Sequence, residues 1–375
     1  MPDLVAVDLP AGQGFVDALH RAWDAGNAVF PIDPRLPPPA VATLVEALRP
    51  TVVIDGEGSH RLDGGMPTEP GDALVIATSG TTGAPKGVVH THHSIEASAR
   101  ATSARLDVDP RSDRWVACLP LAHVGGLSVV TRALITGTPC TILERFDPGE
   151  VERLARQGAT LVSLVASALR RLDPAGYRSV LVGGAAPPEA LPDNVITTYG
   201  MTETGSGIVY DGMPLAGAEL RIGGPGCGSA DELQVRGAML LRCYRDGTDP
   251  KDPDGWFPTG DAGYLDPDGT LTVHGRIDEV VVTGGEKVWP GPVERVLGTH
   301  PGVDQVAVWK RSDGEWGERV VAWVVPVDRS APPDLDDLRT LVTEQLAPWC
   351  APRQLAIVAS LPRTPSGKVR RADLP

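Results

Sequence analysis

Paired cysteines, long apolar runs and an excess of basic residues are all missing from this sequence. The five cysteines, at positions 118, 140, 227, 243 and 350, show no paired spacing, so neither a disulfide framework nor a zinc site is indicated. The longest apolar stretch, residues 161–169, is far too short to span a bilayer. The first residues lack the basic start and apolar core of a signal peptide. These absences favour a cytoplasmic protein without a membrane span.

The charge balance narrows the class of partner. The chain has 48 acidic and 34 basic residues, which gives a net charge of −14. This excess of negative charge disfavours nucleic acid or an anionic membrane surface as the main partner. With 375 residues the chain is long for a single core, so two domains are predicted.

A hydroxyl- and glycine-rich turn organises the sequence. Residues 78–87 read Thr-Ser-Gly-Thr-Thr-Gly-Ala-Pro-Lys-Gly and lie between two apolar runs typical of strands. Glycine lets the backbone turn sharply and approach a ligand, and successive N–H groups in such a turn can bind an anion. Four hydroxyls and Lys86 on the same turn predict a polyphosphate site. The Gly-Lys-Ser/Thr ending of a Walker A loop is absent, and a hairpin turn without a ligand is the alternative interpretation.

This turn resembles the phosphate loop of the adenylate-forming superfamily, which includes acyl-CoA synthetases, luciferases and peptide-synthetase adenylation domains. The resemblance implies that ATP is bound by residues of the turn, namely Thr78, Ser79, Gly80, Thr81, Thr82, Gly83 and Lys86. It also implies an α/β fold, in which a large N-terminal domain of layered α/β sheets with a small β-rich subdomain precedes a small, mobile α+β domain. We place the two domains at 1–277 and 278–375. Alternating helix and strand patterns over residues 15–55 independently predict a parallel sheet, in an N-terminal region shorter than is usual in the superfamily.

A second motif, residues 198–205, reads Thr-Tyr-Gly-Met-Thr-Glu-Thr-Gly after a strand pattern. Tyr199 can cover the face of a purine. Thr202 can bond the α-phosphate or the carboxylate, and Glu203 offers the hard oxygen ligands that Mg²⁺ prefers. A polar loop after a strand is the alternative. The resemblance implies that further residues line the nucleotide, namely Gly183, Gly184, Ala185, Thr198, Gly200 and Met201.

His123 follows a predicted strand at 115–119 and precedes a predicted helix at 128–135, beside two glycines. A lone histidine is usually a structural hydrogen-bond donor. The segment resembles the superfamily's acyl-pocket motif, however, in which an aromatic residue or a histidine gates the carboxylate site, so we expect His123 to lie at the acid. We expect the preceding helix, residues 94–105, to be capped by Ser94.

The remaining motifs lie near the end of the chain. The segment Trp-Phe-Pro-Thr-Gly-Asp261 resembles a superfamily signature, in which the aspartate accepts from two ribose hydroxyls. The resemblance further places Arg276 at the ribose and phosphate, Asp278 at the hinge and Gly285 where the pantetheine thiol enters. The terminal Pro-Arg-Thr-Pro-Ser-Gly-Lys368 matches the mobile lysine motif, whose charge meets both the carboxylate and the α-phosphate. An Asp-Gly turn and a solvated lysine are the structural alternatives.

Together these motifs predict an ATP-dependent carboxylate–CoA ligase that uses ATP, Mg²⁺ and coenzyme A as co-substrate. Residues 119–132 and 162–171 resemble segments of acyl-CoA ligases for an aromatic dicarboxylate, and this resemblance implies such a substrate. Another aryl- or acyl-CoA ligase, an adenylation enzyme that loads a carrier protein, and a nucleotide-binding relic without catalysis are the alternatives. The expected partners are therefore a small carboxylic acid, ATP and CoA. The sequence leaves undecided whether the shortened N-terminal edge forms a homodimer.

Overall fold

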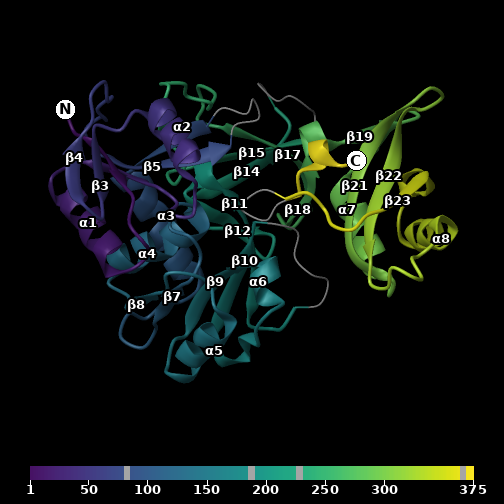
Figure 1. Ribbon diagram of the computed structural model, residues 1–375, viewed down its shortest axis with the longest axis horizontal. Helices are drawn as coiled ribbons and strands as arrows, with labels where there is room; N and C mark the ends of the chain where they lie inside the picture. The colour runs from purple at the N-terminus through teal and green to yellow at the C-terminus, as the bar shows by residue number, and fades with distance from the viewer. Residues whose placement is uncertain (80–84, 185–190, 225–230, 364–368) are drawn as a thin grey trace. The chain divides into compact units, whose positions relative to one another are not determined.

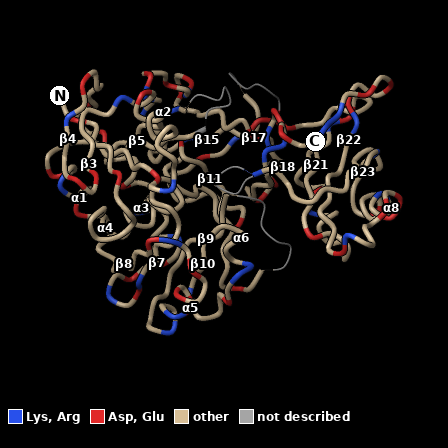
Figure 2. The backbone as a smooth tube through the Cα atoms, in the orientation of Figure 1, with Lys and Arg blue, Asp and Glu red and all other residues tan. Residues whose placement is uncertain are grey.

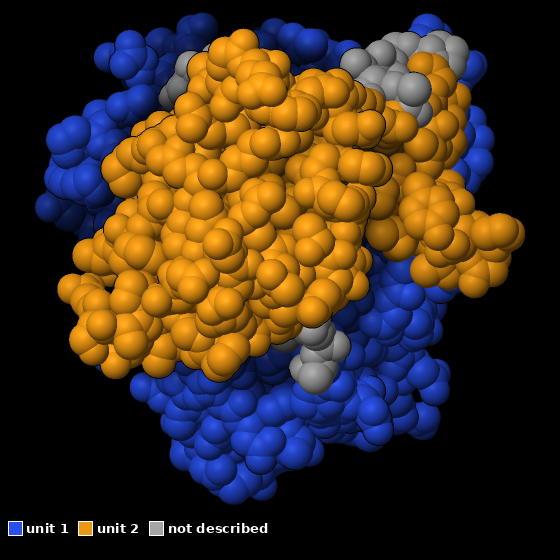
Figure 3. All heavy atoms as spheres, turned by 90° about the vertical axis from the view of Figure 1, so that its right-hand side faces the viewer, with its two compact units in different colours: residues 1–220, 235–257 blue, residues 221–234, 258–375 orange. Residues whose placement is uncertain are grey.

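The computed structural model describes residues 1–79, 85–184, 191–224, 231–363 and 369–375 (Figure 1). The chain divides into two compact units, residues 1–220 with 235–257 and residues 221–234 with 258–375 (Figure 3). Basic and acidic residues are interspersed along the backbone of both units (Figure 2). We expect the hinge between the two domains to lie between residues 277 and 278. This boundary stays a prediction.

The first sheet has seven strands in the order β16-β6-β5-β2-β1-β3-β4. These strands are β1 (Leu4–Val7), β2 (Ala28–Pro31), β3 (Val52–Asp55), β4 (Gly58–Arg61), β5 (Asp72–Ser79), β6 (Pro85–Thr91) and β16 (Cys243–Tyr244). The registers of β1 with β2 and with β3 are parallel, as the alternating pattern predicted. Helices α1 (Gln13–Asp24) and α2 (Pro38–Leu48) make these connections. Strands β5 and β6 form an antiparallel hairpin.

The second sheet has the order β13-β12-β11-β10-β9-β7-β8. Its strands are β7 (Trp115–Ala117), β8 (Cys140–Ile142), β9 (Leu161–Val165), β10 (Ser179–Gly183), β11 (Val195–Met201), β12 (Ser206–Tyr210) and β13 (Met213–Pro214). Helices α5 (Pro148–Arg156), α6 (Ala166–Leu169) and η1 (Pro174–Gly176) lie in its connections, and η2 (Thr202–Thr204) joins β11 to β12. Helix α3 (His92–Arg105) packs on β5 and β6, α4 (Val124–Thr136) packs on β7 and β9, and the two helices contact each other. They therefore form a layer between the first and second sheets (Figure 1).

Two helix starts differ from the sequence prediction. Helix α3 is capped by Thr91, whose side chain accepts from the Ser94 amide at 3.1 Å, while the Ser94 hydroxyl accepts from the Thr91 amide at 3.0 Å. Ser94 therefore closes a capping box from inside the helix, and its prediction as the cap was wrong because Thr91 offers a hydroxyl three residues earlier. Helix α4 begins at Val124 rather than 128. A Cβ on Gly126 would lie 2.4 Å from the carbonyl oxygens of Leu119 and Pro120, so this glycine lets the first turn pack against the preceding strand end.

The stretch after β12 is only partly a sheet of its own. Strands β14 (Ala218–Ile222), β15 (Glu232–Gly237), β17 (Phe257–Leu265) and β18 (Leu271–Arg276) form a four-stranded sheet in that order. In contrast, β13 extends the second sheet and β16 extends the first. Residues 238–240, between β15 and β16, form a turn. The chain passes between the two units within this stretch.

The last sheet has the order β20-β19-β22-β21, with β23 paired to β22. Its strands are β19 (Val281–Thr283), β20 (Glu286–Val288), β21 (Val303–Asp313), β22 (Gly317–Pro326) and β23 (Gln354–Ile357), with helices η3 (Ile277–Glu279), α7 (Pro290–Gly298), α8 (Leu335–Gln345), η4 (Pro348–Cys350) and η5 (Arg371–Asp373). Val293 and Leu297 of α7 and Leu338 of α8 are fully buried with Val308 and Val320. This is the α+β unit that the sequence predicted. Within the described residues, no helix is long and apolar enough to cross a membrane.

Candidate active site

The β5–β6 hairpin joins the two ends of the predicted phosphate loop. Thr78 pairs with Lys86 and Ser79 with Pro85 in the antiparallel register. The hairpin therefore holds the two ends of the predicted loop together, and Lys86 is exposed at one of these ends. Four further predicted residues, Gly80, Thr81, Thr82 and Gly83, lie outside the described residues.

The Thr-Glu motif forms the turn between β11 and β12. Its helix η2 contains Thr202 and Glu203, and the β11–β12 register shifts between Tyr199 and Gly200. A Cβ on Gly200 would lie 2.3 Å from the carbonyl oxygen of Ser206, so β12 can cross here only over a glycine. The turn and its tyrosine are thus placed by β11, β12 and a close backbone approach.

The neighbouring strand contributes the other predicted nucleotide-binding glycines. A Cβ on Gly183 would lie 2.5 Å from Oγ1 of Thr198, because β10 and β11 run parallel side by side. Gly184 has a φ of +81°, which glycine adopts without strain. Ala185 lies outside the described residues. Packing between β10 and β11 therefore accounts for Gly183, and a binding role for these positions stays a proposal.

His90 connects the phosphate-loop hairpin to the Thr-Glu turn. It is fully buried on β6, and its Nε2 lies 2.7 Å from the carbonyl oxygen of Thr202. A carbonyl only accepts, so Nε2 carries the proton and donates. The other ring nitrogen, Nδ1, lies 3.1 Å from the Ser94 hydroxyl. Burial lowers the pKa of His90 to about 4, so the ring is neutral at neutral pH. The sequence prediction assigned no role to this residue.

Tyr244 connects the same two motifs from the other side. Its hydroxyl donates to Oε1 of Glu203 at 3.1 Å. The Lys86 ammonium lies 5.2 Å from the centroid of its ring, within the range of a cation–π interaction. Tyr244 therefore contacts the predicted magnesium ligand and the predicted phosphate-binding lysine at once. No local sequence pattern marks this position, because Glu203 and Lys86 lie far from Tyr244 along the chain.

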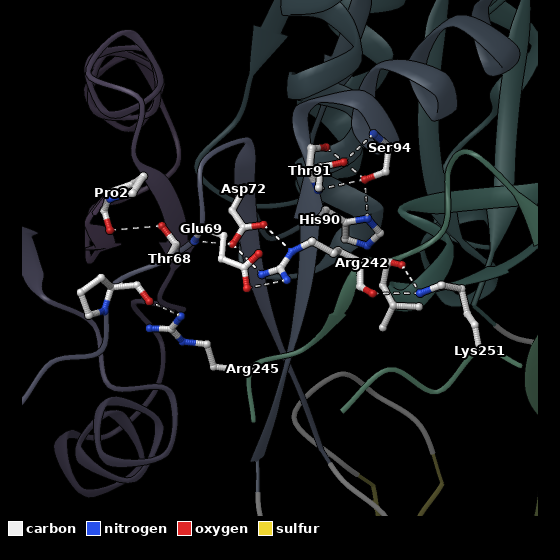
Figure 4. Close-up of polar contacts among 12 residues, drawn as sticks. Pro2, Thr68, Glu69, Asp72, His90, Thr91, Ser94, Arg242, Arg245 and Lys251 are labelled. Carbon is white, nitrogen blue, oxygen red and sulfur yellow. Dashed lines mark hydrogen bonds and ion pairs between the residues drawn. The ribbon is translucent and has the colours of Figure 1, made fainter. Parts of the chain in front are cut away.

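Two arginines on either side of Tyr244 hold its short strand. Arg242 binds the buried carboxylate of Asp72 through Nε at 2.8 Å and Nη2 at 2.9 Å (Figure 4). Arg245 donates to the carbonyl oxygens of Leu48 at 3.1 Å and Pro67 at 3.0 Å. Bidentate, charge-assisted contacts of this kind fix geometry as well as contribute energy. Strand β16 is thereby fastened to the first sheet, with Tyr244 in a defined place.

His123 lies at the strand-to-helix junction, as predicted, in the N-cap position of α4. Its Nε2 lies 3.9 Å from Oδ2 of Asp33, in the turn after β2. Arg35 binds the Asp33 carboxylate and is the main cause that lowers the pKa of that carboxyl, with a smaller effect of His123. The His123 side chain remains 47% exposed, so a ligand can reach it. Its role at the acid stays a proposal.

The second unit brings together three of its predicted residues. Asp261 on β17 stands opposite Arg276 on β18 in the antiparallel register. The Arg276 Nη1 donates to the carbonyl oxygen of Thr259 at 2.9 Å and lies 3.6 Å from Oδ1 of Asp261. Its Nε donates to Oδ1 of Asp278 at 3.3 Å. Arg276 is thus held between Asp261, which we expect to bind the ribose, and Asp278, which we expect to act as the hinge.

The other two predicted residues of this unit differ in how far the structure describes them. Gly285 has a φ of +88°, and a Cβ there would meet no atom of the chain within 4 Å. Lys368 lies outside the described residues. The flanking Arg363 and Val369 pair as an antiparallel bridge, and Arg371 is bound to Glu279 and Glu294.

The donor set fits magnesium better than a transition metal. Glu203 supplies a hard carboxylate at the turn, and among the described residues no three His, Cys, Asp or Glu side chains form a metal cluster. Mg²⁺ is usually held by one or two carboxylates together with substrate phosphates. A single carboxylate next to a phosphate loop therefore suits a Mg²⁺ ion that arrives with a nucleotide.

Comparison with known proteins gives consistent matches along the chain. Residues 60–244 match the AMP-binding enzyme family, and residues 292–368 match the AMP-binding enzyme C-terminal domain. A probable 2-succinylbenzoate–CoA ligase of Mycobacterium tuberculosis is 41% identical over 328 residues, which cover 80% of this chain and 83% of that protein. The 2-succinylbenzoate–CoA ligase of Geobacillus kaustophilus is 36% identical over 337 residues, covering 80% and 68%. The Bacillus subtilis o-succinylbenzoate CoA synthetase, solved with its acyl-adenylate OSB-AMP, aligns with a TM-score of 0.86 and 27% identity over 99% of this chain and 87% of that one.

Proposed function

The chain belongs to the AMP-binding enzymes, the adenylate-forming family of acyl-CoA ligases, and we propose that its substrate is 2-succinylbenzoate, which it activates with ATP and joins to coenzyme A for menaquinone biosynthesis. The relatives that share 41% and 36% of their aligned residues with this chain carry that activity in their names. The charged motif residues of the family are present here, so a nucleotide-binding relic is disfavoured. A cytoplasmic location and a homodimer remain part of the proposal.

One observation carries the proposal. The phosphate-loop hairpin and the Thr202–Glu203 turn are held together by a buried hydrogen bond from His90 and by the contacts of Tyr244. Activation of a carboxylate requires two anions, the acid and the triphosphate, to meet in line. Joining a phosphate-binding loop to a turn with a hydroxyl and a carboxylate provides a place for that encounter.

The residues of the first unit divide this work. Lys86 and the amides of the loop bind the phosphates and offset their charge, and the Thr202 hydroxyl donates to the carboxylate or the α-phosphate. Glu203, oriented by Tyr244, would hold a Mg²⁺ ion that comes with ATP, and this ion supplies further charge neutralisation. His123 then lies toward the acid, and Tyr199 against the purine.

The residues of the second unit act on the nucleotide and the thiol. Asp261 accepts from the ribose hydroxyls, and Arg276, held by the Thr259 carbonyl, donates to the ribose and phosphate. Lys368 stabilises the charge that develops during adenylation. A rotation about Asp278 then presents Gly285 to the site for the thiol step.

Acid-dependent exchange of labelled pyrophosphate into ATP tests the activity. We expect exchange with 2-succinylbenzoate and release of product only after CoA is added. Exchange with no acid in a panel of aryl and acyl carboxylates would identify a relic. Product release that depends on a carrier protein instead of CoA would identify an adenylation enzyme that loads such a protein.

The division between the half-reactions has its own test. Lys368→Ala should reduce adenylate formation by about 10²-fold or more, because a preorganised charge is lost at the transition state. Thioester formation from supplied adenylate should be largely kept. Gly285→Leu should do the reverse, blocking the thiol step and leaving pyrophosphate exchange intact. Equal losses in both half-reactions for either variant would contradict this division.

A further inference from the structure

The backbone of the Thr202–Glu203 turn is held by hydrogen bonds from two sides. The Thr202 carbonyl oxygen accepts from Nε2 of His90 at 2.7 Å and from the Gly205 amide at 3.0 Å. The Glu203 carbonyl oxygen accepts from the Leu241 amide at 2.8 Å. Thr202 and Glu203 are only partly buried, and their helix η2 is three residues long. Backbone hydrogen bonds, more than side-chain packing, therefore set the place of the two residues that act on the anions and on Mg²⁺ in the proposed reaction.

The bond from His90 determines which of its ring nitrogens carries the proton. A carbonyl oxygen only accepts, so Nε2 is protonated, and in a neutral imidazole the other nitrogen, Nδ1, is then an acceptor. His90 is fully buried, so an acceptor without a donor would be costly in free energy. The donor is the Ser94 hydroxyl of α3, whose oxygen lies 3.1 Å from Nδ1 (Figure 4). The hydrogen bond at one nitrogen thus fixes the tautomer that the bond at the other requires.

Ser94 has a single hydroxyl proton and two acceptors within reach. Its Oγ also lies 3.0 Å from the carbonyl oxygen of Thr91, the N-cap residue of α3. The carbonyl of an N-cap residue already accepts the first hydrogen bond of its helix, whereas Nδ1 of His90 has the Ser94 hydroxyl as its one partner among the described residues. The proton therefore belongs to Nδ1. The Ser94 oxygen in turn accepts from the Thr91 amide at 3.0 Å, which holds the serine in place.

Packing keeps the imidazole ring from turning away from the turn. A Cβ on Gly205 would lie 3.4 Å from Cε1 and 3.6 Å from Nδ1 of His90, so the ring packs against the backbone at the end of the turn. Gly205 has a φ of +69°, in the left-handed region that glycine adopts without strain. His90 therefore contacts the turn at Thr202 and again at Gly205.

We propose that Ser94 and His90 form a hydrogen-bond relay that positions the Thr202–Glu203 turn for adenylate formation. The Ser94 hydroxyl donates to Nδ1, and Nε2 donates to the Thr202 carbonyl. The start of α3 thereby fixes the residue whose hydroxyl binds the acid or the α-phosphate, together with the neighbouring Mg²⁺ ligand. Ser94 and His90 act through Thr202, so both are positioning residues. The inference rests on the proposed function, which gives Thr202 and Glu203 these roles.

Two substitutions of His90 in the full-length enzyme separate positioning from folding. His90→Leu keeps a similar volume and removes the donor to Thr202, so acid-dependent pyrophosphate exchange should fall by about 30-fold, because small displacements of reacting groups are costly. His90→Gln keeps an N–H donor at the end of the side chain and should restore exchange to within about fivefold of wild type. Thioester formation from supplied adenylate should fall by about threefold or less in both variants, because the acid and the phosphate are already joined. Equal losses of His90→Leu in the two half-reactions would mean that His90 only supports the fold, and would overturn the inference.

The Ser94 step has a matched control in the same capping box. Ser94→Ala and Thr91→Ala each remove one hydroxyl of the cap and should destabilise the helix start to a similar extent. Only Ser94→Ala also removes the donor to Nδ1 of His90. Ser94→Ala should therefore lower pyrophosphate exchange by about tenfold, and Thr91→Ala by less than about twofold. Equal losses would assign the effect to the helix start and would contradict the relay.

The tautomer has a direct spectroscopic test in the full-length enzyme without ligands. Ring ¹³C and ¹⁵N chemical shifts of labelled histidine distinguish the two neutral tautomers, and among the eight histidines the His90 signal is the one missing from His90→Gln. We expect His90 to be protonated on Nε2 in wild type at neutral pH, and Ser94→Ala to lose this single form. A wild-type ring protonated on Nδ1 would overturn the relay.

Failure of this inference differs from failure of the proposed function. If pyrophosphate exchange proceeds in wild type and His90→Leu retains it, the proposed function stands and the relay is wrong. If no acid supports exchange in wild type, the proposed function fails, and binding of ATP with Mg²⁺ then decides the relay together with the tautomer. His90→Leu should weaken that binding by about tenfold, while Thr91→Ala should leave it unchanged. Equal affinities of these two variants would overturn the relay.

Discussion

Two arginines with little solvent exposure, one in each unit, differ in what surrounds them. Arg371 of the second unit binds Glu279 through Nη1 at 2.6 Å and Glu294 through Nη2 at 2.9 Å, and its Nε donates to the Val308 carbonyl at 3.2 Å. Arg132 of the first unit meets a serine and a tryptophan. The chain satisfies Arg371 completely, so its charge serves the fold. Among the described residues, Nε and Nη1 of Arg132 have no hydrogen-bond partner, so the burial of this charge is not offset in the same way.

The largest expected effect is on Arg371. Arg371→Met leaves Glu279 and Glu294 without their partner, and the free energy of unfolding of the second unit should fall by about 3 kcal/mol. Hydrogen exchange of amides in β21 and β22 measures this loss. Arg370→Met is the matched control, because the Arg370 side chain is 58% exposed and its ion pair among the described residues is with Asp373, so the loss should be within about 0.5 kcal/mol. Equal losses in the free energy of unfolding for Arg371→Met and Arg370→Met would show that the ion pairs of Arg371 do not stabilise the second unit. The contrast between Arg371 and Arg132 would then fail.

His90 adds the case of a buried basic group that the fold keeps neutral. Its pKa in the folded chain, about 4, lies below the ordinary value of 6.5, so the unfolded chain binds the extra proton first as pH falls. The stability that His90 contributes is complete above pH 6.5 and is lost between pH 6.5 and 4, by up to about 3 kcal/mol. Urea unfolding of wild type and His90→Gln at pH 7, 5 and 4 measures the difference. Parallel pH dependences would show that His90 is not responsible.

The hydrogen bond from Tyr244 to Glu203 could position the Glu203 carboxylate for Mg²⁺ binding or merely stabilise the fold, and a substitution separates the two. Tyr244→Phe removes the hydrogen bond to Glu203 and keeps the ring beside Lys86. The Mg²⁺ concentration for half-maximal pyrophosphate exchange should rise about fivefold, which corresponds to one hydrogen bond of about 1 kcal/mol. Tyr210→Phe is the control, since its hydroxyl lies 3.1 Å from the Thr102 hydroxyl in the core of the same unit. It should lower stability and leave the Mg²⁺ dependence unchanged, and a shift in both variants would argue against positioning.

The smallest effect is expected for the stability of Arg132→Met. Removal of an unpaired buried charge offsets the loss of the tryptophan stack and the serine hydrogen bond, so the free energy of unfolding should change by less than about 1 kcal/mol. Urea unfolding without ligand measures it. A loss as large as that of Arg371→Met would place Arg132 among the residues that serve the fold and would end the contrast between the two arginines.

Local patterns predicted much of the fold and part of the site. The alternation of helix and strand predicted the parallel β1, β2 and β3, and the glycines and hydroxyls near Thr78 predicted a loop whose two ends pair in the β5–β6 hairpin. The register that brings Arg276 beside Asp261 follows from two adjacent strands, so these residues were within reach of motif reasoning.

The residues that the sequence did not predict have partners that are distant along the chain. His90 bonds a carbonyl 112 residues away, and Arg132 bonds a serine 74 residues away. Tyr244 reaches Glu203 only because β16 joins the first sheet. Such contacts depend on how helices and sheets pack, which no local spacing encodes. The start of α3 shows the limit at short range, since Thr91 and Ser94, three residues apart, both offer a hydroxyl for the cap.

The arginine contacts that fasten β16 to the first sheet also bear on whether chains of this protein associate in concentrated solution. Unpaired strand edges invite other chains to add strands, and proteins protect them with short, charged or covered edges. β16 is two residues long, lies at the end of the first sheet beside β6, and is flanked by the arginines that bind Asp72 and the Leu48 carbonyl. The strand that carries Tyr244, beside the proposed nucleotide site, thus also covers the edge of β6, so the same two residues of backbone would serve both the proposed site and resistance to aggregation.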